Sequence, residues 1–299
     1  MIKKIISLTS QMVSNPTEVA YHALGKMSPS CLQKKYIRRC HKNGVNGLKF
    51  ILSFDCDTEE DFNVAWDVHS RLIDMGIMPV YAVPGELLIR GEKVYQRIKD
   101  TGAEFINHGY TEHTYFNEET GLNASCFFYD TLSEEMVRND IRNGDKCLRD
   151  VLGVVPQGFR TPHFGTYSKP EHLKVLYSEL ENLNYTFSSS TPPIFGYCKG
   201  PAHKVGGIIE FPVTSTGSRP LSILDSWAFL AKDNPHRQQG RYLLETKLKA
   251  AEFETANIGL INIYADPSHV AGQREFFEAV AIWSKIAENT NYSTLIGEL

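Results

Sequence analysis

The sequence predicts an α/β fold, an irregular seven-stranded (β/α) barrel with an N-terminal helical extension. Two observations lead to this prediction. From residue 48 onward, seven short apolar runs alternate with longer segments of helical periodicity, which is the pattern of a parallel sheet with crossover helices. Four of the runs also end in clusters of polar residues, as strands do where a barrel carries its chemistry. A chain of 299 residues with 42% apolar content is ample for such a core.

The first segment, residues 1–45, is set apart by its charge. It holds eight lysines and arginines against Glu18 alone, which gives a net charge of +7. Because the whole chain has a net charge of −4, the remainder carries −11. Apolar residues between 2 and 13 fall near helical spacing, and short helices are expected at 17–26 and 34–40. We interpret residues 1–45 as a solvated helical extension and residues 46–299 as the barrel. Contact of the basic segment with an anionic membrane surface is the alternative.

Several classes of protein are disfavoured by the same composition. No stretch approaches the ~20 apolar residues of a membrane span, and the start of the chain lacks the continuous apolar region of a secretory signal. The six cysteines are scattered without CxxC pairs, as expected for reduced thiols in a cytoplasmic protein. No nucleic-acid partner is expected, because a known binding motif is lacking. The expected location is therefore the cytoplasm, with a peripheral contact at the inner membrane face as the variant.

The elements of the barrel follow in order. The first strand starts at Leu48 and ends at Asp55, and its apolar run is typical of a strand buried on both faces. The other strands are expected at 78–83, 104–107, 158–160, 185–188, 208–213 and 260–264. Helices are expected at 60–75, 92–99, from the cap Ser133 to about 152, at 170–183, 242–255 and 274–286.

The four polar clusters at strand ends are Asp55-Cys56-Asp57 and the segments 107–113, 158–163 and 264–269. Because such ends meet at one mouth of a barrel, these clusters are expected to converge. A carboxylate with two imidazoles is the ligand set of an open, catalytic metal site, and Asp57, His108 and His113 supply it. Asp55 is then placed to remove a proton from water, and Arg160 to orient Asp55. Such a site hydrolyses an amide or an ester.

The motifs FDCD, NHGYTEH, GFRTPHFG and YADP, in this order, resemble the polysaccharide deacetylase family with the chitooligosaccharide-deacetylase (NodB) homology domain, carbohydrate esterase family 4. The resemblance covers about residues 48–288. It is nearest to the branch with Asp-x-Asp and His-Gly-Tyr motifs. It implies an irregular seven-stranded barrel that removes N-acetyl groups from amino sugars with a divalent metal, usually zinc.

The resemblance also implies roles for single residues. Asp55 matches the catalytic base of the family, and Asp57 and His108 match metal ligands. His113 matches the second metal histidine but comes one residue later than usual; Glu112 stands at the usual offset and is the alternative. Arg160 matches the arginine that holds the base. Pro162 and His163 match the floor of the substrate groove.

The last motif departs from the family pattern, since Asp266-Pro267 stands where the family has His-Pro. The family histidine is the general acid for the leaving amine. An aspartate normally titrates near ~3.9 and would need a raised pKa to serve at neutral pH. His269 is the alternative proton donor. Trp227 is expected either to line a sugar subsite or to belong to the core.

The function expected from these observations is metal-dependent N-deacetylation of an amino sugar, as a nucleotide-, lipid- or oligosaccharide-linked precursor in surface-polysaccharide synthesis. Two other functions remain open. The replacement by Asp266 favours a non-catalytic carbohydrate-binding relative. The His-Gly-Tyr motif also occurs in relatives that hydrolyse small, non-sugar amides.

Overall fold

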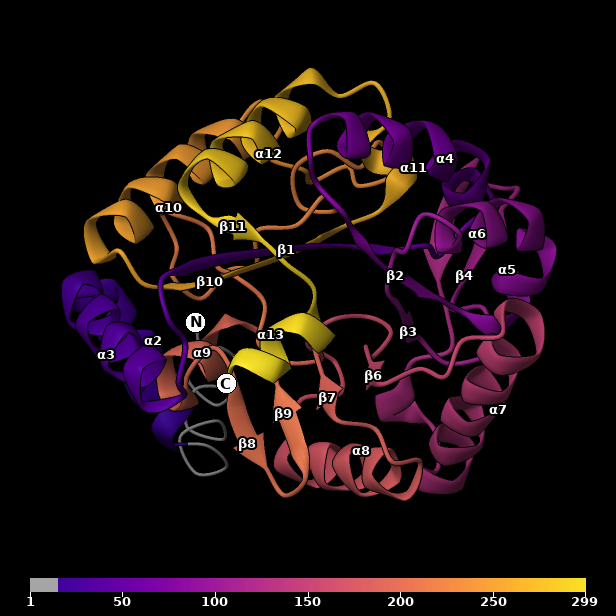
Figure 1. Ribbon diagram of the computed structural model, residues 1–299, viewed down its shortest axis with the longest axis horizontal. Coiled ribbons are helices and arrows are strands. Elements are labelled where there is room, and N and C mark those ends of the chain that lie inside the picture. The colour runs from indigo at the N-terminus through magenta and orange to yellow at the C-terminus, as the bar shows by residue number, and fades with distance from the viewer. Residues whose placement is uncertain (1–15) are drawn as a thin grey trace.

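In the computed structural model, which describes residues 16–299, parallel strands form a curled sheet enclosed by helices (Figure 1). Seven strands lie in the order β10-β1-β2-β3-β6-β7-β9, and every neighbouring pair is parallel. The predicted fold class is confirmed, and these seven strands are the ones that the sequence predicts. Their bounds are β1 Leu48–Asp55, β2 Val80–Val83, β3 Phe105–Asn107, β6 Gly158–Phe159, β7 Phe187–Ser188, β9 Ile208–Glu210 and β10 Gly259–Ala265.

The barrel is irregular because no strand ladder joins β9 to β10, the two ends of this order. The segment after β9 contacts β10 instead. Thr214 N donates to the Asn262 carbonyl and Asn262 N donates to Thr214 Oγ1, each at a distance of 2.8 Å. Two further strands extend the sheet. β8 (His203–Val205) pairs antiparallel with β9 at its edge, and β11 (Glu288–Asn289) pairs with the start of β1.

Helices form the outer layer that Figure 1 shows around the sheet. The sequence-predicted ones are present: α4 Glu59–Asp74, α6 Glu92–Lys99, α7 Glu134–Leu152, α8 Pro170–Asn182, α10 Tyr242–Ala256 and α12 Arg274–Ile286. Ser133 caps α7 as predicted, since its side chain accepts from Met136 N. Gly153 caps the C-terminus of α7 with a φ of 67°, a conformation that favours glycine.

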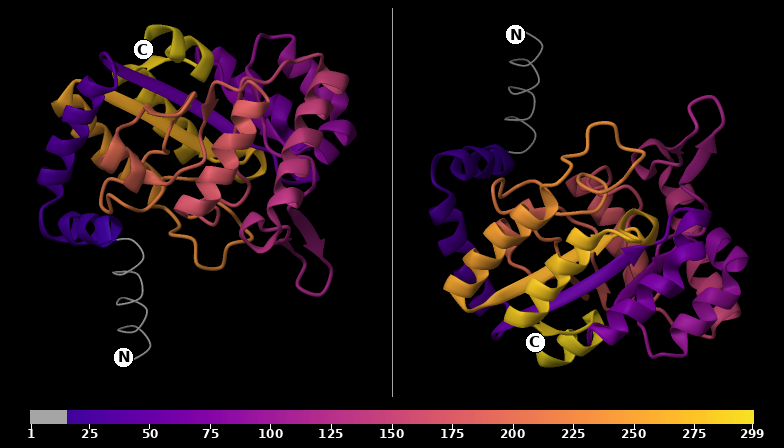
Figure 2. Two further views of the ribbon diagram at one scale, coloured as in Figure 1. Left: turned by 90° about the horizontal axis from the view of Figure 1, so that it is seen from below. Right: turned by 90° about the horizontal axis from the view of Figure 1, so that it is seen from above.

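Several short elements lie in segments where no element is predicted. They are α5 Gly85–Arg90, the hairpin of β4 Thr114–Asn117 and β5 Leu122–Ser125, the 3-10 turn Tyr129–Thr131, α9 Pro193–Lys199, α11 Pro267–Val270 and α13 Tyr292–Glu298. Figure 2 shows α13 and the β4–β5 hairpin on opposite faces of the barrel. α13 therefore covers the end of the barrel away from the hairpin.

Before the barrel lie α2 (Pro16–Met27) and α3 (Pro29–Lys42), and both contact α9. α3 is longer than the helix predicted at 34–40, and its start is set by Pro29 at the first turn. The helical spacing predicted between residues 2 and 13 lies outside the described residues. Within residues 16–299, no helix combines the length and apolarity that crossing a membrane requires.

Candidate active site

The carboxyl ends of the strands bring the predicted polar side chains to one end of the barrel, and some of them line a groove there. Asp55 ends β1, His108 follows β3, Arg160 follows β6 and Asp266 follows β10. The groove has a volume of about 470 Å³. Its lining includes Asp55, Asp57, His163, Phe164, Asp225, Trp227, Tyr264, Asp266 and His269.

Asp57, His108 and His113 face one another with their ligand atoms all within 4.8 Å. Asp57 Oδ1 lies 3.3 Å from His108 Nε2 and 3.0 Å from His113 Nε2. Both imidazoles are buried. Side chains from the segments that follow β1 and β3 thus present one carboxylate and two nitrogens to one point, which is a ligand set for an open metal site.

The hydrogen bonding around these three side chains fits a cation. His108 Nδ1 lies 2.8 Å from the Arg160 carbonyl, which can only accept, so that Nδ1 carries the proton and Nε2 the lone pair. Asp57 Oδ1, His108 Nε2 and His113 Nε2 are buried without a hydrogen-bond partner. Burial raises the pKa of the Asp57 carboxyl, but the two imidazoles lower it by more. The net pKa of Asp57 therefore lies well below its usual value. A divalent metal would satisfy all three atoms at once.

His113, and not Glu112, faces Asp57. The Glu112 carboxylate pairs instead with Arg90. The backbone N–H of Glu112 donates to Glu86 Oε2 at 2.7 Å. The preceding turn is held by Asp140, which accepts from the N–H groups of residues 110 and 111 at 3.2 and 2.9 Å. These bonds fix the loop between His108 and His113, which is one residue longer than the spacing usual in the family, so that His113 still faces Asp57.

Arg160 holds Asp55 with a fully paired guanidinium. Nη1 donates to Asp55 Oδ1 at 2.8 Å and to Ser53 Oγ at 2.7 Å. Nε donates to the Ser189 carbonyl at 3.2 Å, and Nη2 donates to Ser189 Oγ at 3.0 Å and to Tyr292 Oη at 2.8 Å. All five N–H groups of Arg160, which is 0% exposed, are therefore used. This network fixes the position of Asp55 Oδ1.

Asp266 and His269 form a pair at the other side of the groove, with Oδ2 and Nδ1 2.9 Å apart. Ser226 Oγ accepts from Asp266 N at 2.9 Å and lies 3.1 Å from His269 Nδ1. Burial raises the pKa of Asp266 to about 7. Burial lowers the pKa of His269, but Asp266 beside it raises the net value to about 9. The pair therefore retains a proton at neutral pH.

The remaining predicted residues are divided between the groove and the interior. His163 lines the groove, with Nε2 2.7 Å from the Cys126 carbonyl and its ring stacked 4.3 Å from Phe128. Trp227 also lines the groove, and 44% of it is exposed, so it is not a core residue. Pro162 is buried and does not belong to the groove lining.

Sequence reasoning missed several residues of this site. Asp225 accepts from Ala228 N at 2.7 Å and from Tyr264 Oη at 3.2 Å, and burial raises its pKa to about 6. Ser226 bridges Asp266 and His269 as described above. The sequence feature that could have identified both residues is the segment Asp225-Ser226-Trp227, of which only Trp227 was predicted to belong to the site.

Comparisons with known proteins agree with the motifs. Residues 49–182 match the family model described as polysaccharide deacetylase, which confirms the predicted resemblance. No curated protein sequence matches the chain.

Solved structures with a similar fold include a putative polysaccharide deacetylase from Mycobacterium smegmatis, with 16% identity, a TM-score of 0.56 and coverage of 84% of this chain and 89% of that one. A probable polysaccharide deacetylase from Pseudomonas aeruginosa PAO1 has 10% identity, a TM-score of 0.58 and coverage of 87% and 93%. PuuE allantoinase has 10% identity, a TM-score of 0.58 and coverage of 84% and 89%. At these identities the similarity shows a shared fold.

Proposed function

We propose that this chain, a member of the polysaccharide deacetylase family through residues 49–182, removes the N-acetyl group of an amino sugar by metal-dependent hydrolysis. One observation carries the proposal: the ligand atoms of Asp57, His108 and His113 converge within 4.8 Å, and Asp57 lines the groove together with Asp55. Two imidazoles and one carboxylate favour zinc among the divalent metals.

The metal, when bound, supplies polarisation of the amide carbonyl and activation of a water molecule. The protein supplies the proton transfers. Arg160 bonds Asp55 Oδ1, which leaves Oδ2 to take a proton from the attacking water. The Asp266–His269 pair gives its proton to the departing amine nitrogen, so that Asp266 does not prevent catalysis.

The substrate that this site favours is an N-acylated sugar. Trp227 and Phe164 in the lining offer aromatic faces for a sugar ring, and Phe164 is itself stacked 4.8 Å from Tyr264. We propose a nucleotide-, lipid- or oligosaccharide-linked precursor of a surface polysaccharide, handled in the cytoplasm. The basic helix α3 supports a peripheral contact with the inner membrane face, because its 14 residues include no acidic one.

Acetate release and metal content test the proposal together. A chelator is expected to abolish acetate release from acetylated sugars. Asp55→Asn is expected to retain equimolar zinc and to lose about 10²- to 10⁴-fold in kcat, since general-base catalysis contributes that much. Asp74→Asn, an exposed carboxyl on α4, is the matched control and keeps wild-type rates.

Zinc-loaded Asp55→Asn protein with an unchanged rate would refute the assigned roles. A panel of acetylated sugars, formylated sugars and allantoin separates the alternatives. Sugar binding without any product would favour a non-catalytic relative, and product from allantoin alone would favour a hydrolase of small amides.

A further inference from the structure

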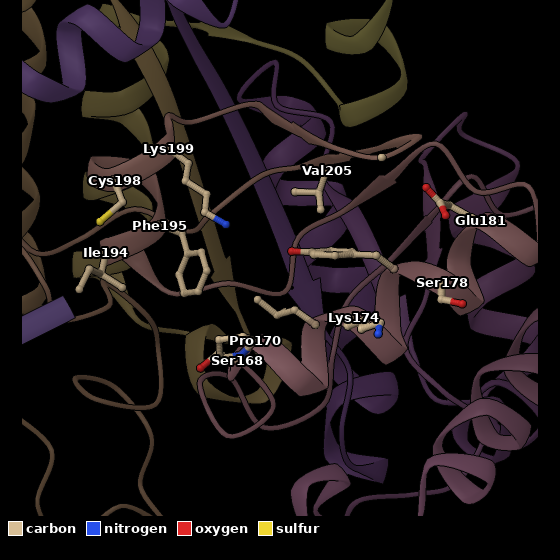
Figure 3. Close-up of a pocket in the computed structure, with 13 residues that line it drawn as sticks. Ser168, Pro170, Lys174, Ser178, Glu181, Ile194, Phe195, Cys198, Lys199 and Val205 are labelled. Carbon is tan, nitrogen blue, oxygen red and sulfur yellow. The ribbon is translucent and has the colours of Figure 1, made fainter. Parts of the chain in front are cut away.

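A second cavity, of about 610 Å³, lies outside the catalytic groove and shares no lining residue with it (Figure 3). It is bounded by α8, α9 and the turn between β8 and β9. Its lining consists of Ser168, Pro170, Leu173, Lys174, Tyr177, Ser178, Glu181, Ile194, Phe195, Cys198, Lys199, Val205 and Gly206. The volume falls within the ~300–1,000 Å³ that small-molecule sites span.

The walls of this cavity are mostly apolar. Leu173 and Tyr177 come from α8, Phe195 from α9 and Val205 from β8, and in Figure 3 Phe195 and Val205 point toward a common space. The α8 residues of the lining recur at helical spacing, so they form one face of that helix. Binding of an apolar ligand against this face is favourable, because it removes the apolar surface of both from water.

The acidic groups near the cavity are already engaged. Tyr177 Oη donates to Glu210 Oε2 at 3.2 Å, and Glu210 Oε1 accepts from the N–H groups of residues 190 and 191 at 2.9 Å. Glu181 Oε1 accepts from Gly207 N at 2.7 Å, which fixes the β8–β9 turn. The lining therefore holds one carboxylate, Glu181, against the two lysines Lys174 and Lys199.

Positive charge gathers at the α9 end of the cavity. Lys199 Nζ lies 5.4 Å from the centre of the Phe195 ring and points toward the same space in Figure 3. α3 adds Lys35 and Arg39: these two and Lys199 lower the pKa of Cys198, although burial raises its net value to about 11. Among the side chains that the structure describes, no carboxylate pairs with Lys199, Lys174, Lys35 or Arg39.

We propose that this cavity binds an anionic lipid, with its hydrocarbon chain between α8 and α9 and its phosphate or carboxylate head at Lys199. Charge complementarity favours an anionic head group at the exposed Lys199, and the apolar walls favour a hydrocarbon chain. A neutral hydrocarbon would not use the positive charge, and a small inorganic anion would leave the apolar walls uncovered. The site is separate from catalysis, so it stands whether or not the proposed deacetylation is correct.

Binding of dodecyl phosphate below its micelle concentration, measured by calorimetry on the full chain without metal, tests the proposal. We expect one molecule to bind per chain, and inorganic phosphate and dodecyltrimethylammonium to bind at least tenfold more weakly. Lys199→Glu is expected to weaken dodecyl phosphate binding at least tenfold. Lys247→Glu, an exposed lysine on α10 outside the cavity, is the control and keeps wild-type affinity.

A second variant tests the apolar half. Ser178→Trp places a large side chain into the cavity from α8 and is expected to abolish binding with an unchanged circular dichroism spectrum. Equal affinities of Lys199→Glu and Lys247→Glu, or equal binding of the cationic amphiphile, would overturn the proposal. So would binding to anionic phospholipid vesicles without binding of monomeric dodecyl phosphate, because that result would assign the charge to a surface contact.

Discussion

At the scale of single residues, the main departure from the family pattern is Asp266. Its carboxylate lies 2.9 Å from His269 Nδ1, and the raised pKa values of both groups mean that the pair carries one proton at neutral pH. Under the proposed function, the proton donor that the resemblance places at position 266 is supplied by His269, three residues further along on α11. This arrangement predicts a specific pH dependence.

The alkaline limb of the rate profile is expected to depend on Asp266. The pKa of His269 is raised to about 9, so its proton is present below that pH and is lost as the pH rises through it. In Asp266→Asn the carboxylate that raises this pKa is gone, and the limb should move down toward the ordinary histidine value of ~6.5. The measurement is kcat against pH between 5 and 10.

The control for this prediction is Asp100→Asn, an exposed carboxyl at the end of α6. It is expected to leave the profile unchanged. If Asp266→Asn lowers the rate equally at every pH, His269 is not the proton donor.

At the scale of elements, Asp61 joins three parts of the site. From the first turn of α4, its Oδ2 accepts from the N–H groups of Asp57 and Thr58 at 3.0 and 2.9 Å. Its Oδ1 accepts from Ser268 N on α11 at 2.9 Å. Thr58 and Asp61 also form the capping box of α4. One buried carboxylate thus holds both the loop that carries Asp57 and the short helix that carries His269.

Asp61→Asn is expected to weaken metal binding without removing a ligand. The amide keeps one acceptor oxygen, so one of the two sets of backbone N–H groups loses its partner and Asp57 is held less firmly. Loss of such an outer contact typically costs 10- to 100-fold in metal affinity. Competition with a zinc-binding dye measures the dissociation constant. Asp67→Asn, an exposed position on the same helix, serves as the control; a lower melting temperature with unchanged zinc affinity would make Asp61 purely structural.

The accuracy of the sequence prediction also varies by element. Long periodic segments such as α7 and α12 were predicted nearly to their ends, because helical spacing and caps are local signals. The hairpin β4–β5 was missed, although Gly121 at φ 66° marks its turn, since its exposed strands lack a clear alternation. The strand expected at 158–160 is shorter in the structure, because β6 pairs with its neighbours over Gly158–Phe159 only.

At the scale of the whole molecule, the alternation of strands and helices predicted that distant residues would meet at one mouth. It could not predict contacts that cross the barrel. Tyr292 stands in the last helix, far from any motif, yet its ring is buried between Phe187 and Phe211 at centroid distances of 4.9 and 5.3 Å. Only the folded chain places its hydroxyl beside Arg160. The last helix is thus connected through Arg160 to Asp55 in the groove.

This connection makes Tyr292 a positioning residue. Its hydroxyl accepts a hydrogen bond from Arg160 Nη2 and donates one to Asn262 Oδ1, each at 2.8 Å. Tyr292→Phe leaves one N–H of Arg160 Nη2 and the Asn262 Oδ1 acceptor without a partner, a loss of roughly 1–3 kcal/mol in the free energy of unfolding. Because Arg160 then holds Asp55 less firmly, kcat is expected to fall roughly 10- to 100-fold while KM is unchanged.

Tyr95→Phe is the matched control, because it removes a buried hydroxyl that has no hydrogen-bond partner among the described residues. Denaturant unfolding and steady-state kinetics of the two variants separate stability from positioning. If Tyr292→Phe lowers stability but keeps the wild-type kcat, the contact with Arg160 only supports the fold. If kcat falls at constant KM in this variant alone, the last helix of the chain sets the position of the base at the opposite end of the barrel.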